Sequence, residues 1–518
     1  SRTEAVEFST TLSFHIFELQ EIIEKLNHWD VGKAAGPDGF PAVFWNSCSS
    51  SLALPLQMIF QRSLNTGQFP KIWKVSRLQP IFKSGDRSDI ANYRGISIIS
   101  AIPKLFEAIL TDEICQSFKD YIIPEQHGFF GGRSAATNLA VYQDFLITSV
   151  EKGHQIDTIY TDLSKAFDSV CHTLLLKKLS EIGISGNYLA WISSYLQDRS
   201  QWVEICGSRS GEVFATSGVP QGSHMGPVLF SLFINDVKSC FRSSKILLYA
   251  DDLKMYGRVQ PGGDYLQSDL DRFVYWCSEN FLKINVSKCK AISFYKTVNP
   301  YNTGYVINGE PVEAVEFIND LGVIFDRNLS FNLHINNITL KGLRLLGFIK
   351  RNTKYMTDTR ALMCLYNCLV LSILEYCSVI WSPTYDVHKN RLERVQNKFI
   401  RYLLFKHHFP SFGVPYETRL LLCGMKSLET RRRNALFLFL FKLLNNEIKC
   451  DTLLQLVSFQ VPVRQTRQQQ LFHVRLHRTN YGLTAFVDRM LMNYNRFYAD
   501  CDIFRFKLPR IKFLIAQK

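Results

Sequence analysis

The segment Lys245-Ile-Leu-Leu-Tyr-Ala-Asp-Asp-Leu-Lys-Met-Tyr256 places two adjacent carboxylates between two short apolar runs. The runs predict two antiparallel strands joined by a two-residue turn with Asp251 and Asp252 at its centre. Asp-Asp suits such a turn poorly, because its central residues favour positive φ and two like charges repel unless a cation offsets them. A polar surface turn explains most Asp-Asp pairs, so a metal-binding turn requires a further ligand.

Asp162 is the candidate for that further ligand. The run Thr158-Ile-Tyr-Thr161 is rich in β-branched and aromatic residues and predicts a strand that ends at Asp162. Two or three carboxylates supply the hard oxygen ligands of Mg²⁺, and two such ions can bridge an attacking hydroxyl, a phosphorus and a leaving pyrophosphate. Aspartates at strand ends also serve phosphatases and nucleases, so these three residues alone leave the reaction open.

Further blocks of sequence flank these aspartates in a fixed order. They are residues 92–98, 125–134, 161–168, 218–223 with 226–230 and 234–236, 282–288 and 317–323. Together with Tyr249-Ala-Asp-Asp252, the series resembles the conserved blocks of reverse transcriptases. Residues 365–401 are similar to the thumb of jockey-like non-LTR (LINE) retrotransposons, so the chain is identified as a member of that group.

The resemblance implies an α+β right-hand polymerase fold. It divides the chain into fingers (31–150), a ferredoxin-like palm with an antiparallel sheet (151–335) and a helical thumb (336–420), with the whole reverse transcriptase domain at about 65–330. An amphipathic pattern, with Phe14, Phe17, Ile22 and Leu26 roughly on one face, predicts an N-terminal helical extension over residues 1–30, and residues 421–518 form a basic, α-rich C-terminal region. The run of residues 75–82 predicts a strand. Independently, β-rich runs alternate with helical patterns from Thr158 to Phe325, and the pattern is helical from about Asn332 onwards.

The implied activity is that of an RNA-directed DNA polymerase, a nucleotidyltransferase that copies retrotransposon RNA into DNA from a 3′-hydroxyl primer. Its partners are then an RNA template, a DNA primer or target DNA, and dNTPs, with two Mg²⁺ ions as cofactors and Mn²⁺ as a substitute. Two alternatives remain: another type of reverse transcriptase, maturase-like or telomerase-like, and an inactive or domesticated nucleic-acid-binding scaffold. The endonuclease domain usual in jockey-like elements is expected to be missing from this chain.

The same resemblance assigns roles at the catalytic centre. Asp162 and Asp251 are expected to bind both metal ions, Asp252 supports the site, and the backbone carbonyl of Leu163 is a further metal ligand. Two cations, Lys83 and Arg94, are expected to grip the incoming triphosphate, for which the forked guanidinium is well suited. The alternative for both cations is a solvated charge in a turn.

Four other residues are expected to contact the nucleotide. Phe167 occupies the position beneath the sugar where an aromatic ring excludes a 2′-hydroxyl, and RNA-dependent RNA polymerases place an acidic residue near this point. Gln221 and Gly222 are expected beside the nascent base pair, and Lys288 matches a lysine proposed to protonate the leaving pyrophosphate. The alternatives are a core position for Phe167 and an exposed structural lysine for Lys288.

The positive charge is concentrated at one end of the chain. The chain of 518 residues has a formal net charge of +14, and residues 391–518 hold 23 of its 60 basic residues but only 8 of its 46 acidic ones. Such an excess favours an anionic partner. The candidate contacts to nucleic-acid phosphates are Arg133, Arg391, Arg394, Lys398 and Arg401.

The remaining composition narrows the setting of the protein. Thirteen cysteines without a Cys-x-x-Cys pair do not suit a disulfide scaffold or zinc ribbon, which favours a reducing interior, nuclear and/or cytoplasmic. Cys364 and Cys368 lie in an apolar stretch and are expected in the core. The longest dense apolar run, residues 435–441, is far shorter than the ~20 residues that span a bilayer, so no membrane partner is expected.

Overall fold

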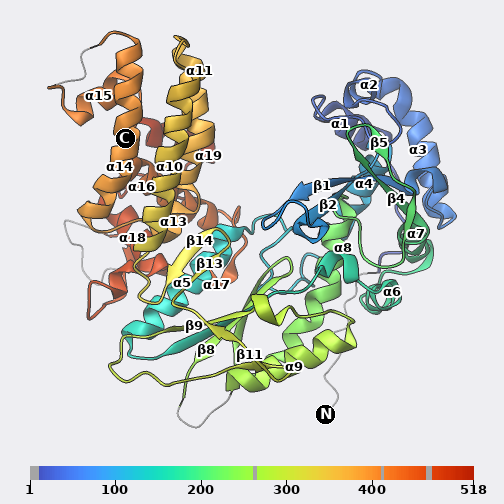
Figure 1. Ribbon diagram of the computed structural model, residues 1–518, viewed down its shortest axis with the longest axis horizontal. Helices are drawn as coiled ribbons and strands as arrows, with labels where there is room; N and C mark the ends of the chain where they lie inside the picture. The colour runs from blue at the N-terminus through green and yellow to red at the C-terminus, as the bar shows by residue number, and fades with distance from the viewer. Residues whose placement is uncertain (1–10, 261–264, 410–412, 462–469, 518) are drawn as a thin grey trace.

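The computed structural model describes residues 11–260, 265–409, 413–461 and 470–517 (Figure 1). It confirms a mixed fold of helices and several sheets, the coarse class predicted from the sequence. Within these residues, none of the helices has both the length and the apolar character that crossing a bilayer demands. Residues 1–10 of the predicted N-terminal helical extension lie outside the described residues.

A five-stranded sheet lies at the centre of the molecule. Strand β3 is its middle strand and pairs antiparallel with both β8 and β9, β7 pairs antiparallel with β8, and β12 runs parallel to β9. The predicted antiparallel sheet is therefore present apart from one short parallel edge. In spatial order the strands are β12 (Glu313–Ala314), β9 (Lys290–Phe294), β3 (Ile156–Thr161), β8 (Asp252–Arg258) and β7 (Lys245–Tyr249).

Each face of the sheet contributes to a different hydrophobic core. Ile159 and Met255 point into a core shared with the N-terminal half, whereas Leu247 and Tyr256 point into a core shared with the C-terminal helices. Successive side chains of a strand point to opposite faces, so these strands are apolar on both sides. The sheet is thus buried between two packed layers.

The N-terminal half contains a second sheet of order β2-β1-β4-β5, in which β6 pairs with the beginning of β4. Strand β1 covers the residues predicted for it. The strands are β1 (Val75–Phe82), β2 (Tyr93–Ile98), β4 (Arg199–Ile205), β5 (Ser208–Arg209) and β6 (Val213–Ala215). The helices are α1 (Leu19–Asn27), α2 (Ala42–Ser47), α3 (Ser49–Asn65), α4 (Ala101–Ser117), α5 (Ala135–Glu151), α6 (His172–Glu181), α7 (Gly186–Leu196), α8 (Met225–Ile234) and α9 (Tyr265–Glu279).

Helix α1 is shorter than the predicted N-terminal helix. It begins at Leu19, and Phe14, which was placed on its apolar face, is exposed outside any helix. The backbone at Leu12 instead forms a β-bridge with Ile184, so the chain at this point is extended rather than helical. Phe17, Ile22 and Leu26 are buried as the pattern predicts.

The C-terminal part is an array of helices that begins where the sequence pattern changes, at Asn332. Cys364 and Cys368 are exposed rather than buried, because the apolar face of their segment is formed by Leu362, Tyr366 and Val370. The helices are α10 (Asn332–Asn352), α11 (Thr359–Tyr366), α12 (Ser372–Glu375), α13 (Ser378–Trp381), α14 (Asp386–Lys406), α15 (Tyr416–Leu422), α16 (Leu428–Leu444), α17 (Asp451–Leu454), α18 (Phe486–Phe497) and α19 (Leu508–Gln517). Short two-stranded pairs complete the chain: β10 (Val306–Ile307) with β11 (Glu310–Pro311), β13 (Phe317–Asp320) with β14 (Val323–Asp326), and β15 (Ser458–Phe459) with β16 (Phe472–His473).

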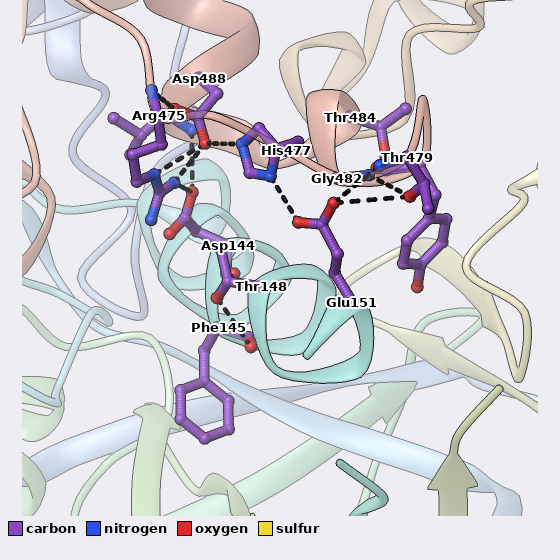
Figure 2. A network of polar contacts seen from close by, with 12 residues as sticks. Asp144, Phe145, Thr148, Glu151, Arg475, His477, Thr479, Gly482, Thr484 and Asp488 are labelled. Atoms are coloured by element: carbon purple, nitrogen blue, oxygen red, sulfur yellow. Dashed lines mark hydrogen bonds and ion pairs between the residues drawn. The ribbon is translucent and has the colours of Figure 1, made fainter. Parts of the chain in front are cut away.

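A polar network joins α5 to the C-terminal segment (Figure 2). Arg475 donates to the carboxylates of Asp144 at 2.9 Å and Asp488 at 2.8 Å. The ring of His477 lies between the carboxylates of Glu151 and Asp488, with Nε2 2.8 Å from Asp488. Three carboxylates thus interact with one arginine and one histidine. Protonation of the histidine adds a positive charge that stabilises the ionised carboxylates.

The network predicts a stability that depends on the charge of His477. Burial lowers the pKa of His477, but its hydrogen bonds to Glu151 and Asp488 outweigh burial, and the net pKa is raised above 6.5. A raised folded-state pKa contributes stability that is full below the unfolded value and is lost as pH rises through the folded value. We expect His477→Gln to cost about 1–3 kcal/mol of unfolding free energy at pH 6 and less at pH 9.

Thermal unfolding of both proteins between pH 6 and pH 9 measures this difference. His473→Gln is the matched control, because its side chain is exposed and lies outside the network. A cost of His477→Gln that is equal at both pH values would contradict the protonated bridge.

Candidate active site

The turn between β7 and β8 presents Asp251 at its tip. Tyr249 pairs with Asp252, so the two central residues are Ala250 and Asp251, and the predicted Asp-Asp centre is wrong by one residue. Ala250 has φ of 59°, so the positive φ that such a turn needs is adopted by Ala250. Asp252 is consequently the first residue of β8 and its position is set by strand pairing.

Gln126 holds this turn in place, a role that the sequence did not reveal. Its side-chain carbonyl accepts hydrogen bonds from the backbone N–H groups of Ala250 (3.0 Å) and Gly128 (2.9 Å). Its amide donates to the carbonyl oxygen of Ala250 at 3.2 Å, and the side chain is buried. The block 125–134 was expected on the template side, but Gln126 also positions the backbone next to Asp251.

Asp162 lies at the end of β3, beside the turn. Thr161 pairs with Leu253 in the antiparallel β3–β8 pair. Asp162, which follows Thr161, therefore lies next to Asp252, which precedes Leu253. The carbonyl oxygen of Asp162 accepts a hydrogen bond from Asn285 at 2.8 Å, and Leu163 bridges to Ile284. The backbone on both sides of the carboxylate is therefore fixed by neighbouring segments, while metal binding by the Leu163 carbonyl stays a prediction.

The three carboxylates affect one another electrostatically. Desolvation raises the pKa of Asp251, and the charge of Asp162 adds to this effect, although Arg94 and Lys83 oppose it. Desolvation, Asp251, Asp320 and Asp162 together raise the pKa of Asp252 to about 6. When the three carboxylates are ionised, the nearby cations thus do not fully offset their negative charge.

This donor set fits divalent cations. Carboxylate oxygens are hard ligands, and a cation would relieve the repulsion that raises these pKa values. In the described part of the chain, no three acidic, His or Cys side chains are grouped so that they could hold a metal ion by themselves, so a cation here would need ligands besides these carboxylates. Such a set suits Mg²⁺, which keeps several waters and binds through one or two carboxylates together with substrate phosphates.

The sequence-predicted cations come to the same place from two different segments. In the β1–β2 pair Ile81 lies opposite Arg94, and the backbone N–H of Lys83 donates to Asn92, which sets both cations at one end of the hairpin. Burial, Arg94 and Lys288 lower the pKa of Lys83, while Asp162 and Asp251 raise it. Lys288 forms an ion pair with Asp162 at 3.7 Å.

A buried ion pair behind Asp252 was missed by sequence reasoning. Lys254 pairs with Asp320, both side chains are at most 6% exposed, and the hydroxyl of Tyr160 donates to Asp320 at 3.0 Å. Lys254 is two residues after Asp252 on β8 and so lies on the same face of the sheet, a spacing that could have identified it. A cavity of about 240 Å³ connects this pair with Asp162 and Asp252.

Phe167 and the block 218–223 lie against each other. Phe167 is half-buried and stacks on Phe230 with ring centroids 4.4 Å apart, so its ring is held firmly. The amide of Gln221 donates to Asp168 at 2.9 Å. The absence of a side chain at Gly218 allows this close approach, because a Cβ there would lie 2.7 Å from the backbone of Asp168. Asp168 is thus bonded to the block 218–223.

Gly222 adopts a backbone conformation that excludes other residues. Its φ is +109°, and a Cβ there would lie 2.6 Å from the carbonyl oxygen of Ser97. Ser97 also donates to the carbonyl oxygen of Gln221 at 2.7 Å, which ties the loop to β2. Contacts of Gln221 and Gly222 with a nucleotide stay predictions.

The predicted phosphate-binding cations differ in availability. Nη1 of Arg133 donates to the carbonyl oxygens of Ile123 (2.8 Å) and Gln126 (2.7 Å), so it closes the loop before α5. Arg391 donates to Asn336. The other three, at i, i+4 and i+7 of α14, share one face and are exposed: Arg394, Lys398 and Arg401.

The chain is similar to a known protein family and to several individual proteins. A family model described as reverse transcriptase (RNA-dependent DNA polymerase) matches residues 81–349. The RNA-directed DNA polymerase from mobile element jockey of Drosophila funebris is 27% identical over 401 residues, 74% of this chain and 43% of the relative. The probable RNA-directed DNA polymerase from transposon BS of Drosophila melanogaster is 27% identical over 406 residues, 74% of this chain and 44% of the relative.

A more distant similarity points in the same direction. The Pol polyprotein from type-1 retrotransposable element R1 of Bradysia coprophila is 24% identical over 383 residues, 71% of this chain and 37% of the relative. The chain therefore spans less than half the length of these relatives. Because the family match includes both strands that carry the aspartates and covers more than half of the chain, this protein belongs to the reverse transcriptase family.

Proposed function

We propose that this chain is an RNA-directed DNA polymerase of a jockey-like non-LTR retrotransposon, which extends a 3′-hydroxyl primer with dNTPs on an RNA template. The observation that carries the proposal is the meeting of Asp162, Asp251 and Asp252 with Lys83, Arg94 and Lys288. Carboxylates beside cations from separate segments suit a reaction in which a polyphosphate is bound and cleaved. The relatives named as RNA-directed DNA polymerases give the same direction.

In this mechanism Asp162, Asp251 and Asp252 would hold two Mg²⁺ ions, which would supply activation of the primer hydroxyl and positive charge against the phosphates. Arg94 and Lys83 bind the triphosphate and orient it toward the primer. Lys288, next to Asp162, donates a proton to the departing pyrophosphate. Phe167 excludes a 2′-hydroxyl, and Gln221 and Gly222 face the nascent base pair.

The right-hand arrangement follows as part of the proposal. The region 31–150 would act as fingers, the region 151–335 around the central sheet as palm, and the helices of 336–420 as thumb. The exposed cations Arg394, Lys398 and Arg401 on α14 would then contact backbone phosphates of the template and primer, which gives affinity without sequence specificity. An element that primes on chromosomal DNA would act in the nucleus.

Primer extension by the purified chain tests the function. The reaction contains an RNA template annealed to a DNA primer, Mg²⁺ and labelled dNTPs, and a parallel reaction has a DNA template. We expect incorporation on RNA that requires the divalent cation. No incorporation on either template by a protein with a cooperative thermal unfolding transition would reject the activity.

A further inference from the structure

A second cavity lies among the C-terminal helices, away from the aspartates. It has a volume of about 1170 Å³ and is bordered by the segment after α13, the start of α14, α16 and α18. These helices are labelled close together in Figure 1. Six lysine and arginine side chains line the cavity, against a single acidic one: Lys296, Lys389, Arg432, Arg433, Arg489 and Arg496, with Glu429.

Arg432 is the unusual member of this group. Its side chain lies on α16 and the residue is only 3% exposed, yet Nε, Nη1 and Nη2 all lack a hydrogen-bond partner in the described structure. Burial lowers the pKa of Arg432, and three carboxylates in its surroundings offset part of that effect. A buried guanidinium without a partner is unfavourable, so the site requires a counter-ion.

The three nearest carboxylates are already engaged elsewhere. Glu375 accepts hydrogen bonds from Nε and Nη2 of Arg431, and Glu429 forms an ion pair with Lys389 at 3.1 Å. Glu393 accepts from the hydroxyl of Tyr416 at 2.6 Å and from the backbone N–H of Glu429 at 2.9 Å. Among the described residues, each of the three carboxylates that act on Arg432 is therefore already bonded to another group.

Two neighbours add unused donors to the same cavity. Among the described residues, Nδ1 of His388 is buried without a partner, and so is Nε of Arg433, whose guanidinium lies 4.4 Å above the ring of Phe497. Arg489 is mainly a structural group, because its Nη1 and Nη2 donate to the carbonyl oxygens of Ser382 and Ile380, although its buried Nε also lacks a partner there. Arg432 is thus the residue of the cavity lining whose guanidinium nitrogens all lack a partner in the described structure.

We propose that this cavity binds a terminal phosphate group, with Arg432 as the central ligand and Arg433 and His388 beside it. A terminal phosphate carries about −1.5 to −2 charges and three acceptor oxygens, which match a forked guanidinium and several further donors. Because Arg432 is only 3% exposed, an internal phosphodiester of a strand cannot reach it as readily as a chain end or a free phosphate can. The site lies outside the proposed polymerase centre and does not depend on it.

Thermal unfolding of the full chain tests the ligand class. We expect inorganic phosphate at 10 mM to raise the unfolding midpoint by about 2–5 °C relative to sodium chloride or acetate of equal ionic strength. In Arg432→Met the shift should disappear, while the midpoint without phosphate stays equal or rises, because the variant removes an unpaired buried charge. Arg505→Gln, an exposed arginine outside the cavity, is the matched control and should keep the shift.

Several outcomes would overturn the site. These are no shift in the unaltered chain, an equal shift with acetate, an equal shift in Arg432→Met, and a lower midpoint of the phosphate-free variant. The last result would mean that Arg432 is a structural partner of its neighbouring carboxylates. Should Arg432→Met not fold, Arg432→Lys keeps the charge but loses the fork, and its phosphate shift should be smaller than that of the unaltered chain.

Two oligonucleotides identify the source of the phosphate. The same RNA is prepared with a 5′-phosphate and with a 5′-hydroxyl, and both are titrated at a salt concentration that weakens backbone contacts. A preference of at least ~10-fold for the phosphorylated end that is lost in Arg432→Lys assigns the site to a strand end. Equal affinities together with a phosphate shift assign it to free phosphate or a mononucleotide.

Discussion

Replacing Asp251 by Asn is expected to lower dNTP incorporation by roughly 10³-fold or more, which corresponds to about 4 kcal/mol of transition-state stabilisation. Asp251 lies at the tip of the turn and interacts with Asp162, Lys83 and Arg94. The change keeps the size of the side chain but removes the charge that, in the proposed mechanism, would hold a divalent cation. Single-turnover primer extension on the RNA template measures the loss.

The stability of this variant separates chemistry from folding. Like charges at Asp162 and Asp252 destabilise an ionised Asp251, so the unfolding midpoint of Asp251→Asn in the absence of metal should be equal or higher. Asp271→Asn is the control, because Asp271 is exposed on α9 and bonds only to Gln267 in the described structure. Retained incorporation in Asp251→Asn would place the catalytic centre elsewhere.

Replacing Phe167 by Val is expected to raise the ratio of kcat/KM for an NTP to that for the matching dNTP by about 10–100-fold. The ring of Phe167 is held by stacking on Phe230, 4.4 Å between centroids with 21° between planes. In the proposed function this fixed ring lies next to the sugar and excludes a 2′-hydroxyl, so a smaller side chain would admit it. Steady-state kinetics with GTP and dGTP on one template measures the ratio.

The control for this change is Phe241→Val. Phe241 is also a half-buried phenylalanine of the same core, but it packs on Phe273, 5.9 Å between ring centroids. Both variants lose a similar amount of packing, so only a loss of sugar discrimination at Phe167 supports the steric role. An unchanged ratio in Phe167→Val would leave the ring as a core residue.

The parts of the fold that depend on short-range pattern could be predicted. Strand β1 and the helical onset at Asn332 follow from alternation and helical period, and both appear at the expected residues. The turn at Asp251 was displaced by one residue, because pairing of Tyr249 with Asp252 is decided by register with β3 and by Gln126. No local pattern contains that information.

The site could be predicted to a similar extent. Motif resemblance identified residues that the structure brings together, among them Asp162, Asp251 and Lys83. The spacing from Asp252 could have placed Lys254 on the same face of the sheet, but its pairing with Asp320 joins strands that are distant in sequence and could not be predicted. Arg432 escaped for another reason, since an arginine in a run of three looks like a solvated charge until its burial is known.

The network of Figure 2 has a consequence for the synthesis of the protein. Arg475 contacts Asp144 across 331 residues of chain, and the backbone N–H of Val487 also donates to the buried carboxylate of Asp144. At about 5–20 residues per second, the ribosome needs roughly 15–65 s to make the missing partners. During that interval α5 exposes an unfinished apolar face, so nascent chains need chaperone protection until the last hundred residues emerge.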